Sequence, residues 1–213
     1  MRAKYYSYIY IEQKQLCDMK TEKIFQTSIL GVLFLSLLTF GSCKKEIVEQ
    51  VIETPTIETP LVALTDEEIE DLRFLREEEK LAHDVYLYAY EKHNIMIFQN
   101  ISNSEQTHMD NVMTIITKYG LEDPASNERG EFTNQTLQDL YDQLTLKVDS
   151  SLVAALIVGA TIEDLDINDL KLNIERTTKT DLLDMYYLLE CGSRNHMRAF
   201  YKKITNEGAD YSN

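Results

Sequence analysis

The sequence predicts an all-α fold, an antiparallel bundle of four long helices with a crossover connection that carries a short helix between the second and the third. The first observation behind this prediction is composition: only 7 glycines and 3 prolines occur among 213 residues, of which 44% are hydrophobic. Few helix breakers and ample apolar surface favour helices around a core over an all-β fold. The second is periodicity, because apolar residues recur at alternating steps of three and four in four long stretches of residues 65–213.

Residues 1–43 are expected to be an export signal, with Met19 as the true start. Two lysines after Met19 lead into the apolar run 29–40, and Gly-Ser then precedes Cys43. This order resembles a bacterial lipobox, in which the cysteine is lipidated and becomes the mature N-terminus, although Phe40 stands in place of the usual leucine. The run is short for a membrane span of about 20 residues, and an uncleaved anchor is the alternative. With either alternative we expect the remaining chain to lie in the cell envelope, on the periplasmic or extracellular side. If the lipobox is used, a lipid on Cys43 attaches the chain to a membrane.

Residues 44–64 are expected to form an extended tether, since they repeat Ile-Glu-Thr-Pro and show no helical periodicity. The folded domain is expected to span residues 65–213. It carries the whole net charge of −15, because acidic and basic residues are equal in number before residue 65. An acidic domain repels nucleic acid, which is therefore not expected as a partner, whereas self-association into a homo-oligomer stays open.

The first long helix is expected over residues 65–93. It opens with Thr-Asp-Glu-Glu, the pattern of a capping box. Glu79 interrupts the middle of its apolar stripe, and Tyr86 follows about two turns later on the same face, where its hydroxyl can reach a neighbouring carboxylate. The adjacent Glu77 and Glu78 fall off this stripe and are expected in solvent.

The second helix is expected over residues 97–119, and its apolar stripe is interrupted by Glu105 and His108. Residues three apart in a helix project from one face about one turn apart, so an acid and an imidazole at this spacing can bind one metal ion together. Residues 121–135 are expected to be a loop, followed by a short helix at 137–144 within the crossover.

The third and fourth long helices are expected over about residues 150–172 and 179–205. The apolar stripe of the third runs into Glu163, with Asp166 one turn further on, and that of the fourth is interrupted by His196. All four long helices thus place an acid or an imidazole in mid-stripe. A buried carboxylate without a partner costs several kcal/mol, so the economical arrangement is that these groups meet at a shared cation.

The residue types indicate the class of metal. A bundle core that carries Glu and Glu-x-x-His groups on facing helices is the architecture of dimetal carboxylate proteins. Oxygen and imidazole ligands suit iron, manganese or zinc better than calcium or copper(I). The chain contains no Cys-x-x-Cys zinc pattern and no phosphate-binding loop, which argues against those kinds of site.

Four motifs resemble a known family over about residues 65–206. They are Glu79-Lys-Leu-Ala-His-Asp-Val-Tyr86, Ser104-Glu-x-x-His108, Gly159-Ala-Thr-Ile-Glu163-Asp-Leu-Asp-Ile and Gly192-Ser-Arg-Asn-His196-Met-Arg-Ala-Phe200. Together they resemble the ferritin-like family called domain of unknown function 2202, and the first two also resemble rubrerythrin-like proteins. The resemblance implies a ferritin-like four-helix bundle with a metal site.

The resemblance also implies roles for single residues. Glu79 would be the ligand from the first helix, Glu105 would bridge two metal ions, and His108 would cap one of them. Glu163 and His196 would be the ligands from the third and fourth helices. Iron, in a di-iron or a mononuclear site, is the implied metal, with manganese or zinc as alternatives. Oxidation of the metal by oxygen, or removal of peroxide, is the implied chemistry.

One departure from the rubrerythrin-like pattern bears on the number of metal ions. The fourth helix has Ser193 where a second bridging glutamate is expected, three residues before His196. Asp166 can supply an oxygen instead, and Ser193 and Tyr86 are expected beside the ligands. Whether the chain is an enzyme therefore stays open. The alternative function is a non-catalytic helical module of the cell envelope that binds a protein partner.

Overall fold

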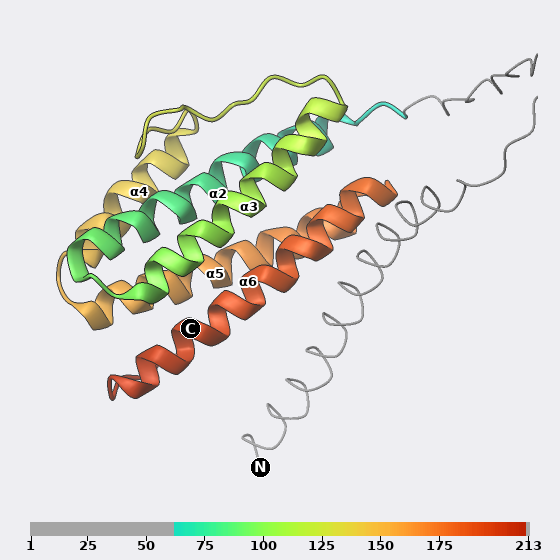
Figure 1. The fold of residues 1–213 in the computed structure, drawn as a ribbon. Coiled ribbons are helices and arrows are strands. Elements are labelled where there is room, and N and C mark those ends of the chain that lie inside the picture. Colours follow the sequence, from blue (N-terminus) through green and yellow to red (C-terminus); the bar gives the residue numbers. More distant parts are fainter. Residues whose placement is uncertain (1–61, 212–213) are drawn as a thin grey trace, which may run out of the picture. The chain divides into compact units, whose positions relative to one another are not determined.

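In the computed structural model, residues 62–211 are described, so the expected export signal and nearly all of the tether lie outside the described residues. This part of the chain is all-helical, with five helices and no strand (Figure 1). The helices are α2 (Asp66–His93), α3 (Met96–Lys118), α4 (Gln135–Val148), α5 (Leu152–Arg176) and α6 (Thr180–Asn206). They confirm the all-α class, and within residues 62–211 no helix combines the length and the apolar character that crossing a membrane requires.

The four long helices form two hairpins that pack against each other. Two residues join α2 to α3 and three join α5 to α6, and within each hairpin the helices pack along their length. The hairpins meet where α2 contacts α5 and α3 contacts α6. The long segment 119–134 runs back along the bundle, so that α4 lies at the end where α2 ends and α5 begins (Figure 1). Each long helix is therefore antiparallel to the long helices that it contacts.

The start of α2 is fixed by the predicted capping box. Thr65 Oγ1 accepts a hydrogen bond from Glu68 N (3.2 Å), and the Glu68 carboxylate accepts one from Thr65 N (2.8 Å). The same carboxylate accepts bonds from Thr177 Oγ1 (2.6 Å) and Lys179 Nζ (2.7 Å), which lie in the turn between α5 and α6. One side chain therefore caps a helix and fastens the two hairpins together.

Two apolar clusters fill the core, and a polar layer separates them along the bundle. The first cluster includes Val85, Phe98 and Phe200, and the second includes Leu72 and Leu182. On every long helix the buried residues between these clusters are mostly polar, and each cluster closes one side of the layer. The acids and imidazoles that we define as the polar layer are Glu79, Glu105, His108, Glu163, Asp166 and His196.

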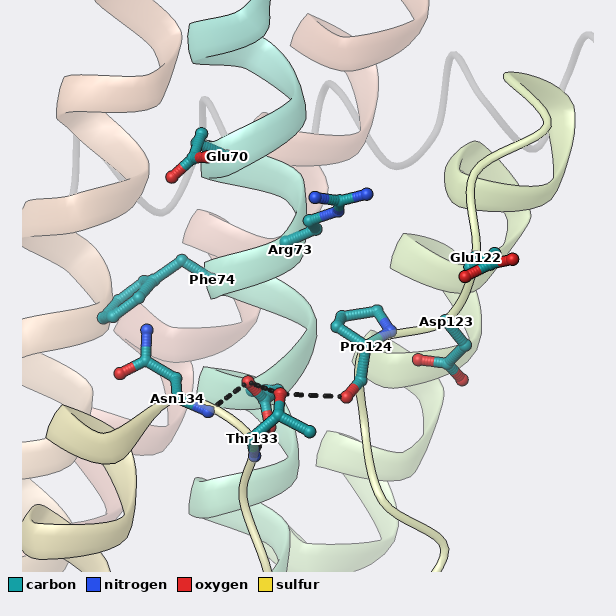
Figure 2. A pocket seen from close by; sticks show the side chains of 9 residues that line it. Glu70, Arg73, Phe74, Glu122, Asp123, Pro124, Thr133 and Asn134 are labelled. Carbon is teal, nitrogen blue, oxygen red and sulfur yellow. Dashed lines mark hydrogen bonds between the residues drawn. The ribbon is translucent and has the colours of Figure 1, made fainter.

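Glu77 and Glu78 are buried, with 2% and 8% of their surface exposed, so the prediction that both face solvent was wrong. Glu77 accepts hydrogen bonds from Thr133 N (2.6 Å), Thr133 Oγ1 (2.8 Å) and Asn134 N (3.0 Å) at the end of segment 119–134. Figure 2 shows Thr133 and Asn134 beside α2. Helical periodicity finds only the stripe that is turned to the other long helices, whereas the face of α2 that carries Glu77 is covered by the connecting segment.

A buried ion pair holds the same segment about one turn further along α2. Lys80 Nζ lies 2.6 Å from Asp84 Oδ2 and donates to the carbonyl of Glu128 (2.8 Å). Asp84 also accepts a bond from Gly130 N (2.9 Å) and lies 2.9 Å from His83 Nδ1. Burial raises the pKa of Asp84, but the bonds with His83, Gly130 and Lys80 outweigh it and hold the pKa below its ordinary value.

Asp84→Asn should destabilise the protein at neutral pH, because it leaves the buried Lys80 ammonium without a counter-charge. Removing one partner of a buried pair typically costs about 3–5 kcal/mol. The folded-state pKa of Asp84 is lowered, so its contribution is complete above the unfolded pKa of about 4 and is lost as pH falls through the folded pKa. Urea unfolding measures the free energy of unfolding of wild type and variant. The difference between the two should be constant from about pH 8 to about pH 5 and should become smaller at lower pH.

The control for this prediction is Glu91→Gln, which removes an exposed ion pair with Arg129 (2.7 Å). It should change the free energy of unfolding by less than about 1 kcal/mol. Equal stability of wild type and Asp84→Asn at neutral pH would contradict the proposed anchoring by Asp84.

Candidate metal centre

The polar layer gathers every side chain that was predicted from the sequence as a metal ligand. Each long helix contributes at least one of them, and none has more than 8% of its surface exposed. They are Glu79 on α2, Glu105 and His108 on α3, Glu163 and Asp166 on α5, and His196 on α6. Acids and imidazoles that are far apart in the sequence are therefore neighbours in the dry interior of the protein.

Glu105 lies at the centre of this layer. Its Oε2 atom is 2.8 Å from His108 Nδ1, and its Oε1 atom is 2.8 Å from His196 Nδ1. The two imidazole rings are stacked, with their centroids 5.4 Å apart. Glu105 thus turns one oxygen to each imidazole and connects two halves of the site.

Each half contains three ligand atoms that lie within 4.8 Å of one another. One half is formed by Glu79, Glu105 and His108, with Glu79 Oε2 at 3.2 Å from His108 Nδ1. The other is formed by Glu105, Glu163 and His196, with Glu163 Oε2 at 3.4 Å from His196 Nδ1. The two halves therefore have the same composition, two carboxylates and one imidazole, and they share one carboxylate.

Four buried atoms of the polar layer have no hydrogen-bond partner: Glu79 Oε1, Glu105 Oε1, Asp166 Oδ1 and His196 Nδ1. The Glu105 and His196 atoms of this set lie 2.8 Å apart and yet do not form a hydrogen bond. Buried polar atoms without partners are rare, and lone pairs of oxygen and nitrogen are what a metal ion binds. The donor atoms of this layer therefore fit iron, manganese or zinc.

The polar layer holds more acid than base. Burial raises the pKa of Glu163 to about 7, and the nearby charge of Glu105 adds to this shift. Burial also raises the pKa of Glu105, but its close contacts with the His108 and His196 imidazoles, and the charge of these imidazoles, outweigh burial and lower the pKa to about 2. Burial lowers the pKa of His196, but its close contacts with the Glu105 and Glu163 carboxylates, and their negative charge, outweigh burial and raise the pKa to about 10. Two imidazoles can neutralise only two of the four carboxylates, so the others must hold protons or share a cation.

Two hydroxyl groups orient the acids of α5. The Tyr86 hydroxyl donates a hydrogen bond to Glu163 Oε1 (2.6 Å), a contact that its spacing along α2 allowed. The Ser193 hydroxyl donates to Asp166 Oδ2, and Asp166 belongs to neither of the three-residue groups. Both hydroxyls thus lie beside the acids, where the sequence placed them.

Two features of the site were not predicted. Ser104 Oγ lies 2.9 Å from His196 Nε2, although Ser104 falls beside the apolar stripe of α3. Gly192 lets the imidazole of His108 lie directly against α6, because a Cβ atom at this position would collide with His108 Nε2. A glycine in mid-helix lowers helix stability by about 1 kcal/mol relative to alanine. Its presence at position 192 was therefore the one feature of the sequence that could have indicated this close contact.

These features define an all-helical protein with a buried centre of carboxylates and imidazoles that fits a metal ion. The family described as an uncharacterized protein domain (DUF2202) matches residues 68–213. The chain is 49% identical over 154 residues to the uncharacterized protein MJ0754 of Methanocaldococcus jannaschii, covering 72% of this chain and 83% of that protein. The crystal structure of the hypothetical protein MJ0754 matches with a TM-score of 0.70 over 72% of this chain and 89% of that chain, also at 49% identity. The chain belongs to the DUF2202 family.

Gly192→Ala should disturb the centre without removing a ligand. Alanine is the better helix former by about 1 kcal/mol, yet its methyl group would overlap His108 Nε2. We therefore expect lower stability and an affinity for Mn(II) or Zn(II) that is weaker by about tenfold or more. Thermal unfolding and isothermal titration calorimetry measure the two effects.

The matched control is the same substitution in a His108→Ala background, which lacks the side chain that the methyl group would meet. There Gly192→Ala should raise stability, because only the gain in helix propensity remains. A destabilisation of equal size in both backgrounds would show that the contact with His108 is not the cause.

Proposed function

We propose that this protein is a ferritin-like metal-binding protein, in which a four-helix bundle with a crossover connection binds two divalent ions, iron before manganese or zinc. The observation that carries the proposal is the pair of three-residue groups that share Glu105. One ion would be bound by Glu79, Glu105 and His108, and the other by Glu105, Glu163 and His196. A carboxylate that turns one oxygen to each group is suited to bridge two ions.

The charge of the polar layer supports two divalent ions. With both imidazoles neutral, the four carboxylates carry four negative charges, which two divalent cations neutralise. Asp166 brings the fourth of these carboxylates to the layer although Ser193 replaces the glutamate of the rubrerythrin-like pattern. Its unpartnered Oδ1 atom is available to a cation, while Ser193 holds Oδ2.

The side chains around the layer would bind and orient the ions and keep water out. Iron, when bound, supplies the electrons that reduce oxygen or a peroxide. The apolar clusters on both sides of the layer exclude water from it. The Tyr86 hydroxyl fixes the carboxylate of Glu163 (2.6 Å), and the small Gly192 gives His108 its place.

Metal analysis of the purified full chain tests this proposal. After anaerobic reconstitution with Fe(II) or Mn(II) and removal of loosely bound ions, we expect about two ions per chain. Glu105→Gln should lose both, because Glu105 belongs to both groups. The control Glu190→Gln removes an acid that pairs with Arg194 (2.6 Å) outside the layer, and it should keep both ions. Fewer than about 0.2 ions per wild-type chain would contradict the proposal.

The rival function is a non-catalytic module of the cell envelope that binds a protein partner. The observation in its favour is that the acids and imidazoles already lie close enough to neutralise one another, with Glu105 at 2.8 Å from both His108 and His196. Under this function a chelator would leave the unfolding temperature unchanged. A layer that binds metal should instead unfold at a lower temperature after chelation.

The membrane attachment is a separate proposal, supported only by the sequence before Cys43. In a bacterial host that lipidates exported proteins, we expect the full chain to incorporate radiolabelled palmitate, because the cysteine of a lipobox is acylated. Cys43→Ser should abolish the label. A wild-type chain without label would contradict the lipid anchor and favour an uncleaved signal.

A further inference from the structure

A surface cleft between α2 and α5 carries more acid than its basic side chain neutralises. This α2–α5 cleft has a volume of about 340 Å³, and its lining includes the acids Glu70, Asp71 and Asp169. Arg176 is the one basic side chain in the lining, and its Nη1 atom lies 2.8 Å from Asp71 Oδ1. Glu70 and Asp169 therefore have no basic partner within residues 62–211.

Asn173 adds a buried amide to the same lining. Only 7% of its surface is exposed, and its side chain forms no hydrogen bond with any residue that the structure describes. Buried amide groups normally have hydrogen-bond partners. An amide that is nine-tenths buried, lines a cleft and has no protein partner therefore indicates that a ligand in the cleft completes its hydrogen bonds.

An aromatic ring and an aliphatic side chain share this lining with the acids. Phe74 of α2 is partly buried, and Leu172 of α5 is 41% exposed. A hydrated metal ion gains nothing from apolar surface, whereas the methylene groups of an organic cation gain by leaving water. An ammonium group is also attracted to the face of an aromatic ring. The lining therefore suits an organic cation better than a metal ion.

We propose that the α2–α5 cleft binds a protonated aliphatic amine. The carboxylates of Glu70 and Asp169 neutralise its charge, and the amide oxygen of Asn173 accepts one of the three N–H bonds of an ammonium group. The methylene groups pack against Phe74 and Leu172. A volume of about 340 Å³ is within the range of small-molecule sites. The inference is independent of the metal centre, because none of these residues belongs to the polar layer.

The second cleft beside α2 is less suited to an amine. It has a volume of about 420 Å³, lies between α2 and segment 119–134, and shares Glu70 and Phe74 with the first cleft (Figure 2). Its lining also contains Arg73, a cation without an ion pair in the described part of the chain, which repels an ammonium group. Its buried acid, Glu77, already accepts hydrogen bonds at both oxygens. The smaller cleft is therefore the candidate.

Isothermal titration calorimetry of the full chain at constant ionic strength tests this inference. The probe is diaminopentane, a five-carbon chain with an amine at each end, and we expect a Kd of about 1 mM or tighter. Pentanediol has the same length without the charge and should not bind. Mg(II) supplies charge without methylene groups, and an equal concentration of it should leave the Kd of the diamine within about twofold of its value.

Three variants locate the binding in the cleft. Glu70→Gln and Asp169→Asn remove one charge each and keep the shape of the side chain, so each should weaken binding of the diamine about tenfold or more. Asn173→Leu removes the amide at similar size and should weaken binding about fivefold. Circular dichroism checks that each variant is as helical as wild type. The matched control Glu122→Gln removes the same charge from the second cleft and should leave the affinity unchanged.

The source of the amine is decided by a lysine that is blocked at both backbone ends. If blocked lysine binds at least as tightly as diaminopentane, the ligand is a lysine side chain of a partner protein, and if it binds more weakly, the ligand is a free diamine. Both results support an amine site. A wild-type chain that does not bind the diamine overturns the inference, as does displacement of the diamine by Mg(II). An equal loss of affinity in Glu122→Gln and Asp169→Asn would show that overall charge attracts the amine, which also overturns it.

Discussion

Four carboxylates and two imidazoles share a buried layer of the core, and the rest of the structure depends on how their charge is neutralised. Each long helix contributes to this layer, and none of the six side chains is more than 8% exposed. An uncompensated buried charge costs several kcal/mol, so the layer would oppose folding unless protons or cations enter it. With a pair of divalent ions bound, the same groups would instead stabilise the packing of the four helices.

The three consecutive glutamates of α2 lie in three different environments. Successive residues of a helix point about 100° apart, so Glu77, Glu78 and Glu79 meet three different surroundings. Glu77 holds the connecting segment through Thr133 and Asn134, Glu78 is buried with an Oε2 atom that has no hydrogen-bond partner, and Glu79 faces the polar layer. The same short stretch thus fixes the crossover, borders a surface opening and supplies a candidate ligand.

Most of the helical architecture and the polar layer could be predicted from the sequence, because both depend on the face that each helix turns to the other long helices. That face has a period, and the acids and imidazoles interrupt it at Glu79, Glu105, Glu163 and His196. The burial of Glu77 could not be predicted in this way, since the segment 119–134 that covers it has no period of its own.

The close contacts across helices were also beyond the sequence. Gly192 and Ser104 contribute to the site because α3 and α6 lie close together. The distance between two helices cannot be predicted from the spacing of residues along either one. The hydrogen bond from Ser193 to Asp166 likewise depends on the packing of α6 against α5. Ser193 marks a missing glutamate in the motif, but only the packed helices show which acid it contacts.

The most direct test of the central claim is the position of metal ions in crystals of the protein. Data collected from crystals equilibrated with Mn(II), at a wavelength where manganese scatters anomalously, locate bound ions independently of the protein atoms. We expect two anomalous peaks in the polar layer, one on either side of the Glu105 carboxylate. A layer without a peak at saturating Mn(II), Fe(II) and Zn(II), with Glu105 still in contact with His108 and His196, would contradict the claim.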